Sequence, residues 1–158
     1  MGQVCSNEEF VMKVTREELY EIVATCDDDA DLNYLDVSMI KDMSLLFNGS
    51  AFNGDISRWD VSSCGTMFGM FIHSSFNGDI SSWDVSSVER MSWMFDGSCF
   101  TGDISSWDVS SVVAMTDMFR NCCFNGRLTM WNFNKCLDLA DVGCVGGEWK
   151  QFVLMRSL

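Results

Sequence analysis

The sequence predicts an α/β solenoid, a stack of about four to five units of 24 residues each. The evidence is a set of large apolar residues that recur every 24 positions. Four columns keep this step: Trp59, Trp83, Trp107 and Trp131; Phe52, Phe76, Phe100 and Phe124; Phe47, Phe71, Phe95 and Phe119; and Met43, Met67, Met91 and Met115. A fixed period of this length indicates stacked supersecondary units, each of which buries its apolar face against its neighbours.

Composition narrows the class of protein. The chain has 158 residues, 47% of them apolar, which is typical of one domain with a buried core. Its net charge of −13 argues against nucleic acid as a partner and against attraction to anionic lipid, because both depend on Lys and Arg. No apolar run approaches the length of a membrane span, and the N-terminus lacks the apolar core of a secretory signal. We therefore expect an intracellular location, cytoplasmic or membrane-peripheral.

The eight cysteines do not have the spacing of a zinc site, since Cys122 and Cys123 are adjacent and no C-x-x-C pair occurs. Cys64 and Cys136 share a column with aliphatic residues, whereas Cys99 and Cys123 share one with small residues. Free Cys is most often a small buried hydrophobe. We therefore expect buried, free thiols in a reducing compartment, with no metal and no cofactor.

The first residues of the chain, MGQVCS, fit a lipidation motif. Gly2 followed by Ser6 matches the N-myristoylation pattern, and Cys5 is a candidate for palmitoylation. One myristoyl chain anchors only marginally, so a stable anchor would need the second acyl chain on Cys5. A chance match to this short motif is the alternative.

Residues 1–30 are predicted to form an N-terminal tail and a capping helix. Thr15 and Glu18 fit a capping box, and Leu19, Ile22 and Val23 share one helical face, which predicts a helix over about residues 16–25. This helix should cover the open end of the stack, because a terminal unit would otherwise expose its core to water.

The first half of each unit has the pattern of a strand. Ile80-x-x-Trp83-x-Val85 matches the L-x-x-L-x-L pattern of leucine-rich repeats. The alternation of apolar and polar residues predicts a short strand over about residues 82–85. Such strands should stack in parallel, one per unit, so the solenoid is expected to be leucine-rich-repeat-like.

The second half of each unit has the spacing of a short helix. Ser86 and Glu89 fit a capping box, and Val88, Met91 and Phe95 recur at helical intervals, which predicts a helix over about residues 87–95. A glycine-containing turn would then lead to the next strand. The repeats are expected over residues 31–144, and the apolar segment 145–158 is predicted to form a C-terminal cap.

Polar columns are the candidates for a binding site. One column should stack along the concave strand face about 4.8 Å apart, where like charges repel; it contains Asp36, Asp60, Asp84 and Asp108. Hydrogen bonds from backbone N–H groups at the start of the following helix are the favoured compensation, and a bound cation is the alternative. With Arg58, Ser82 and Ser106, this column is the predicted partner-binding surface. A second column follows glycine in a turn and is expected to bond its own backbone; it contains Asp55, Asp79 and Asp103.

The repeat unit resembles a known family. FNGDISSWDVSSVERMSWMF and FTGDISSWDVSSVVAMTDMF are similar to the repeats of BspA-like leucine-rich-repeat surface proteins, in a branch known as a domain of unknown function. The match covers about residues 32–133. The resemblance implies a leucine-rich-repeat-like solenoid used for adhesion or protein interaction, without catalytic residues.

The function predicted is therefore a non-enzymatic repeat module for protein–protein interaction or structural scaffolding. Its partner would be another protein, and the acidic surface favours a basic one. The module could be a subunit of a larger complex or lie at a membrane face through its acylated N-terminus. The alternative is a Ca²⁺-dependent binding or structural protein that uses the stacked Asp column.

Overall fold

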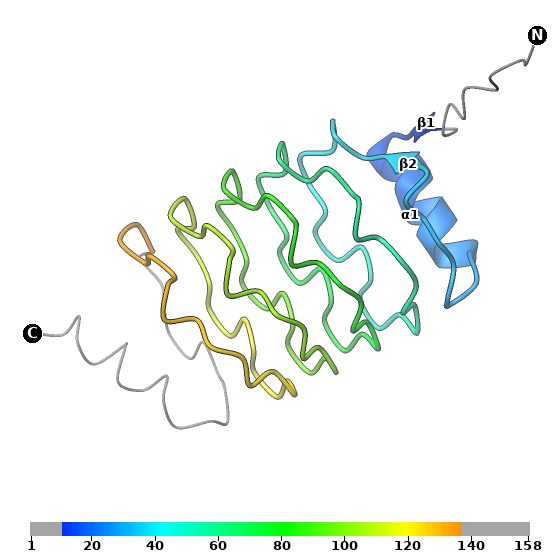
Figure 1. Ribbon diagram of the computed structural model, residues 1–158. Helices are drawn as coiled ribbons and strands as arrows, with labels where there is room; N and C mark the ends of the chain where they lie inside the picture. Colours follow the sequence, from blue (N-terminus) through cyan, green and yellow to red (C-terminus); the bar gives the residue numbers. More distant parts are fainter. Residues whose placement is uncertain (1–10, 137–158) are drawn as a thin grey trace, which may run out of the picture.

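The computed structural model describes residues 11–136, which form a repeat solenoid. Figure 1 shows its coils stacked one behind another, with the only helix of the described residues against the end where the chain enters. Successive coils span residues 31–54, 55–78, 79–102 and 103–126, and a fifth begins at residue 127. Regular secondary structure is sparse, so the coils are held together by turns and by contacts between neighbours. The predicted C-terminal cap, residues 145–158, lies outside the described residues.

Helix α1 (Arg16–Thr25) caps the stack as predicted. The capping box is present, because Thr15 Oγ1 accepts the Glu18 N–H at 3.2 Å and Glu18 Oε2 accepts the Thr15 N–H at 2.8 Å. Leu19 and Val23 are buried in the same apolar cluster as the repeats. Among residues 11–136, no helix has the length and apolar character needed to cross a membrane.

Strands β1 (Met12–Lys13) and β2 (Leu35–Asp36) pair in parallel, with Met12 opposite Leu35. Strand β2 occupies the Trp–Asp columns of the repeat, one period before Trp59. The strand predicted over residues 82–85 therefore forms at the equivalent position of the first coil only, where the N-terminal segment supplies a partner. In the third coil that prediction is wrong, because residues 82–85 are turn and irregular backbone.

Parallel backbone hydrogen bonds between coils run along the other half of the repeat. We call residues 43–49, 67–73, 91–97 and 115–121 the ladder segments. Every second N–H of one ladder segment donates to a carbonyl of the next coil, as Met67 does to Arg90 at 2.9 Å and Phe71 to Met94 at 2.8 Å. The bonds all run in one direction along the stack, so the peptide dipoles of these segments are aligned.

The helix predicted over residues 87–95 is wrong, because this region contributes to a ladder segment instead. The N–H groups of Met91, Trp93 and Phe95 donate to the fourth coil, so they are not available for helical bonds. Trp93 has a positive φ of 59°, which a right-handed helix excludes. Turns in which residue i+3 donates to residue i, such as Met94 to Met91 at 3.2 Å, place apolar side chains on one face at intervals that resemble a helix.

Stacked aromatic rings fill the interior. The Phe47 and Phe71 rings lie 5.3 Å apart at 4°, and the Trp59 and Trp83 rings lie 6.4 Å apart at 5°. Each column tryptophan also donates its indole N–H to a carbonyl of the preceding coil, as Trp83 does to Ile56 at 3.2 Å. The rings of the Phe47–Phe71 pair are closer together than those of the Trp59–Trp83 pair.

Candidate interaction surfaces

The first Asp column is held by hydrogen bonds within its own coil. Asp84 Oδ1 accepts the Ser86 N–H at 3.0 Å, and Asp108 Oδ1 accepts the Ser110 N–H at 2.9 Å. In the first two coils the serine hydroxyl donates as well, to Asp36 and Asp60, at 2.6 Å in both cases. Compensation by backbone N–H groups was thus correctly predicted, but the donors belong to a turn and not to a helix. The Ser86–Glu89 capping box is absent, since the Glu89 N–H donates to Gly65.

These bonds lower the carboxylate pKa values. Hydrogen bonds from Ser86 lower the pKa of Asp84, and those from Ser110 lower the pKa of Asp108. The second Asp column behaves in the same way, as predicted: each carboxylate accepts the N–H of the serine two residues later, which lowers its pKa. Its members are Asp55, Asp79 and Asp103.

Five of the seven predicted partner-binding residues line two shallow depressions. Asp36, Arg58 and Asp60 line one of about 270 Å³ between the first and second coils. Ser106 and Asp108 line another, of about 480 Å³, between the fourth and fifth coils. The structure brings these residues onto one side of the coils, although not onto a hydrogen-bonded strand face.

The side chains of Ser82 and Ser106 link neighbouring coils. The Ser82 hydroxyl donates to the Ser57 carbonyl at 3.1 Å, and the Ser106 hydroxyl donates to the Ser81 carbonyl at 3.2 Å. Each bond joins one coil to the coil before it. Among residues 11–136, no three His, Cys, Asp or Glu side chains are grouped so that they could hold a metal ion. Gly2 and Cys5, the lipidation candidates, lie outside the described residues.

An exposed apolar patch on the ladder segments was not predicted. Trp93 is 38% exposed, and its ring lies 5.2 Å from that of Phe68. Leu45, 41% exposed, and Ile72 meet over Gly69, where a Cβ would lie 2.8 Å and 2.6 Å from their methyl groups. We call Leu45, Phe68, Gly69, Ile72 and Trp93 the ladder-face patch.

The signal for the patch was present in the sequence as departures from the repeat. Phe68 stands in a column that otherwise has Ser44, Ser92 and Thr116. Trp93 stands in the column of Gly69. Large apolar residues at exposed column positions were overlooked because the buried columns dominate the pattern.

A charged network borders the patch. Asp117 Oδ2 accepts the Trp93 indole N–H at 3.1 Å. Arg120 donates to both oxygens of the buried Asp96, at 3.2 Å and 2.7 Å, and to Asp117 at 3.4 Å. Trp and Arg are the side chains most enriched where binding energy concentrates in protein interfaces. The patch thus has an aromatic centre and a charged edge.

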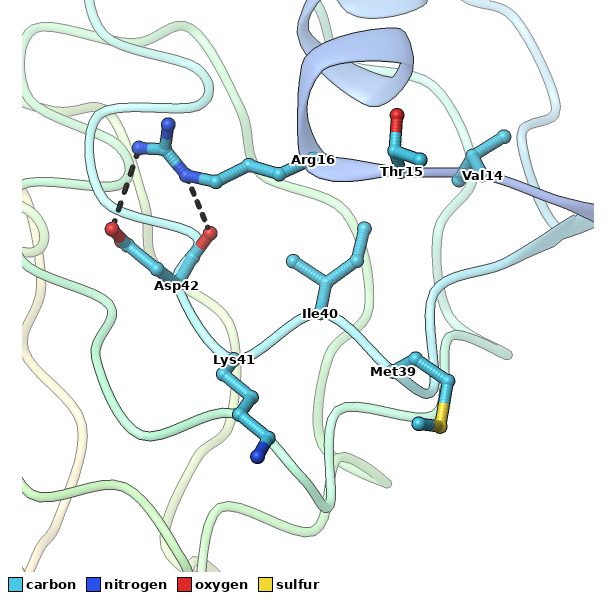
Figure 2. Close-up of a pocket in the computed structure, with 7 residues that line it drawn as sticks. All are labelled: Val14, Thr15, Arg16, Met39, Ile40, Lys41 and Asp42. Carbon is cyan, nitrogen blue, oxygen red and sulfur yellow. Dashed lines mark hydrogen bonds and ion pairs between the residues drawn. The ribbon is translucent and has the colours of Figure 1, made fainter.

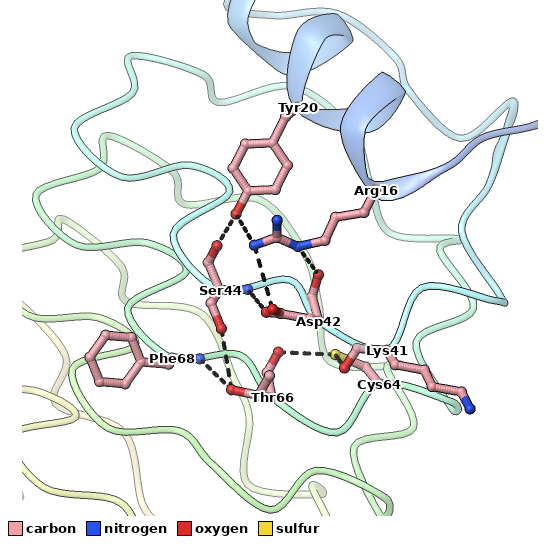
Figure 3. Close-up of polar contacts among 8 residues, drawn as sticks. All are labelled: Arg16, Tyr20, Lys41, Asp42, Ser44, Cys64, Thr66 and Phe68. Atoms are coloured by element: carbon pink, nitrogen blue, oxygen red, sulfur yellow. Dashed lines mark hydrogen bonds and ion pairs between the residues drawn. The ribbon is translucent and has the colours of Figure 1, made fainter.

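The N-terminal end of the stack holds a second network (Figure 3). Arg16 contacts Asp42 and the Tyr20 hydroxyl, and Tyr20 in turn donates to the Ser44 carbonyl. Burial raises the pKa of Tyr20, opposed by Arg16. Beside this network lies a shallow depression of about 440 Å³ whose residues come from the start of α1 and from the first coil (Figure 2); Met39, which lines it, is 76% exposed.

The described cysteines lie in buried, half-buried and exposed environments. Cys64 and Cys136 are buried, as predicted, and burial raises the pKa of Cys64 to about 11. Burial at Cys99 and Cys123 was wrongly predicted, because both are exposed. Their column carries small residues because it faces solvent between two inward-facing columns.

Comparisons place the chain in a family. A family profile described as "Mycoplasma protein of unknown function, DUF285" matches residues 17–131. Searches of curated proteins and of solved structures gave no significant match. The matched segment includes α1 after its first residue and the coils up to Trp131. Because it makes up well over half of the sequence, the chain belongs to the DUF285 family of repeat proteins.

Proposed function

We propose that this protein is a non-enzymatic interaction module that binds another protein through the ladder-face patch. The observation that carries the proposal is the contact between the exposed Trp93 and Phe68, with Leu45 and Ile72 beside them. Contiguous exposed apolar groups with a polar edge are typical of protein interaction sites. The packed coils give this surface a rigid support, which reduces the entropy lost on binding.

The partner proposed is a basic protein segment with apolar side chains. The net charge of −13 favours association with cations, and it acts at a distance through the exposed carboxylates of the Asp columns. Aromatic faces such as Trp93 and Phe68 also attract Lys and Arg side chains. Anchoring would thus come from the patch, whereas the Asp columns would mainly accelerate the encounter.

Substitutions in the Asp columns and in the ladder-face patch have different expected effects on binding kinetics. Substituting Asp60, Asp84 and Asp108 with Asn should slow association and reduce its dependence on salt. The turns should persist, because the Asn side-chain oxygen can accept the same N–H bonds. Substitutions in the patch should instead accelerate dissociation.

The test of the patch uses substitutions to residues that occupy the same columns in other repeat units. Phe68→Ser and Trp93→Gly introduce residues that the same columns carry at Ser44 and Gly69, so the fold should be kept. Met130→Ser is the matched control, because Met130 is 83% exposed, lies outside the patch and shares its column with Ser106.

A random peptide library selected against the wild-type protein should yield basic peptides with apolar anchors. Their dissociation constants should rise by about tenfold or more with Phe68→Ser and Trp93→Gly, and stay unchanged with Met130→Ser. Peptides that bind all three variants equally would remove the patch from the proposal. Selection of acidic peptides would contradict the proposed partner chemistry.

We also infer that the repeats are of the BspA-like leucine-rich-repeat type. The inference is supported by the periodic F-N-G-D-I-S-x-W-D-V-S sequence. It is also supported by coils that stack in parallel, with one coil for each repeat unit. Such a module could serve within a larger assembly or at a membrane face. Within residues 11–136, no group of potential metal ligands favours the calcium-dependent alternative.

A further inference from the structure

Cys99 and Cys123 occupy the same position on neighbouring coils. The Cys99 N–H donates to the Ser74 carbonyl at 3.2 Å, and the Cys123 N–H donates to the Ser98 carbonyl at 3.2 Å. Identical backbone bonds place the two residues in register, 24 residues apart in sequence. Both are exposed, so the two thiols lie on the same solvent-facing column of the third and fourth coils.

Their separation suits a disulfide. Neighbouring parallel segments joined by backbone bonds lie about 4.8 Å apart. The rings of the next residues, Phe100 and Phe124, are 6.2 Å apart. The interstrand spacing falls within the Cα–Cα window of roughly 4.4–6.8 Å that a disulfide accepts, and the stacked rings show that the two coils also lie side by side at the next residue.

The other described thiols are less available. Cys122 is buried, its sulfur accepts the Phe124 N–H at 3.3 Å, and burial raises its pKa. Cys64 and Cys136 are also buried, and Cys26 is half-buried at the end of α1. Of the cysteines in residues 11–136, Cys99 and Cys123 are the exposed ones.

We propose that Cys99 and Cys123 form an oxidisable dithiol that closes into a disulfide between two coils by exchange with a low-molecular-weight disulfide such as oxidised glutathione. One cysteine thiolate attacks the glutathione disulfide, which forms a mixed disulfide and releases one glutathione thiolate. The second cysteine thiolate attacks the protein sulfur of the mixed disulfide and releases the second. The two protein thiols lose two electrons and two protons, and oxidised glutathione becomes two glutathione molecules.

The bond would tie the third coil to the fourth. A solenoid is stabilised by contacts between neighbouring coils, so a covalent link between two of them restricts the unfolded chain and resists local separation. Oxidation should therefore raise the melting temperature of the repeat stack, and reduction should reverse the change.

The experiment is incubation of the full chain with oxidised glutathione, followed by intact-mass measurement and peptide mapping without reduction. The expected result is a monomer that has lost two hydrogen atoms and yields a peptide linking Cys99 to Cys123. Cys99→Ser and Cys123→Ser should each stop at the mixed disulfide, with one glutathione attached. Ser75 shows that serine is accepted in this column.

Cys122→Ser is the matched control, because its column contains Ser74 and Ser98, and it should close as the wild type does. Several results would overturn the proposal: a bond between other cysteines, a dimer linked by disulfides, or a wild-type protein that keeps one glutathione without closing. Loss of two hydrogens by both single variants at Cys99 and Cys123 would overturn it as well.

Discussion

Arg16 Nε donates to the backbone carbonyl of Asp42 at 3.0 Å, and this bond closes the N-terminal end of the ladder. Ladder N–H groups donate toward the C-terminal end of the stack, so the carbonyls of the first coil have no coil before them to bond. Arg16 caps the Asp42 carbonyl, and the Tyr20 hydroxyl caps that of Ser44 (Figure 3). The cation at the carbonyl end of aligned peptides is equivalent to a basic residue at a helix C-terminus.

Replacing Arg16 should therefore destabilise the fold. Arg16→Met keeps an apolar stem but removes the bond to the Asp42 carbonyl and the 3.5 Å ion pair with the Asp42 carboxylate. Because the pair is partly exposed, we expect a loss of about 1–2 kcal/mol in the free energy of unfolding, measured by urea denaturation. Arg16→Lys should recover part of the loss. An unchanged urea midpoint for Arg16→Met would show that the cap contributes nothing.

The column tryptophans should stabilise the fold through their indole N–H groups as well as through the size of their rings. Trp83→Phe preserves most of the stacking surface but removes the 3.2 Å indole bond to the Ile56 carbonyl, which keeps the Trp59 N–H as its other donor. Losing one such hydrogen bond costs about 0.5–1.5 kcal/mol, to which the smaller ring adds the cost of a cavity. Trp93→Phe is the control, since Trp93 lies at the surface. Equal melting temperatures for Trp83→Phe and the wild type would contradict this account.

Alanine substitutions at two glycines, one with a positive φ and one without, distinguish the cost of backbone strain from that of side-chain contact. Gly49 has a φ of 67° with open space where a Cβ would stand, so Gly49→Ala should cost about 1–2 kcal/mol through the left-handed conformation alone. Gly65 has no positive φ, and its Cβ would meet the Lys41 carbonyl at an ordinary 3.7 Å. Gly65→Ala should be neutral, or stabilising by about 0.4–1 kcal/mol through the unfolded state. Chemical denaturation of both variants measures the two changes in the free energy of unfolding. An equal loss at both positions would contradict this prediction.

The repeat period, the buried columns and the cap helix could be predicted from the sequence. Burial of Trp83, Met91 and Phe95 follows from their recurrence, whatever backbone connects them. The capping box at Thr15 and Glu18 is a local signal, and helix α1 begins beside it.

The backbone conformation of the coils could not be predicted from the same evidence. A succession of turns closed by bonds from residue i+3 to residue i gives inward side chains at nearly helical spacing, so Val88, Met91 and Phe95 fit both interpretations. The difference lies in positive φ values at Leu45, Trp93 and Asp117, and Leu and Trp are residue types that seldom adopt them. The ladder-face patch was missed because it depends on which columns face solvent, and the incorrect helix assigned those faces wrongly.

Acidification should weaken the fold through the Asp columns. Hydrogen bonds from Ser86 and Ser110 lower the pKa values of Asp84 and Asp108 below the value of about 3.9 for an unfolded chain. A lowered pKa contributes stability that is fully present above the unfolded pKa and is lost as pH falls through the folded pKa. The melting temperature should therefore fall as pH decreases from about 5 to below 3.

The double variant Asp84→Asn/Asp108→Asn should lose less stability over this pH range. Asn can accept the same turn bonds from Ser86 and Ser110 but does not titrate, so these two positions no longer contribute to acid unfolding. Ser38→Ala is the complementary variant, because loss of the hydroxyl that donates to Asp36 at 2.6 Å should raise the pKa of Asp36, which can be followed by carboxyl-carbon NMR. Identical pH profiles for the double variant and the wild type would show that acid unfolding arises elsewhere.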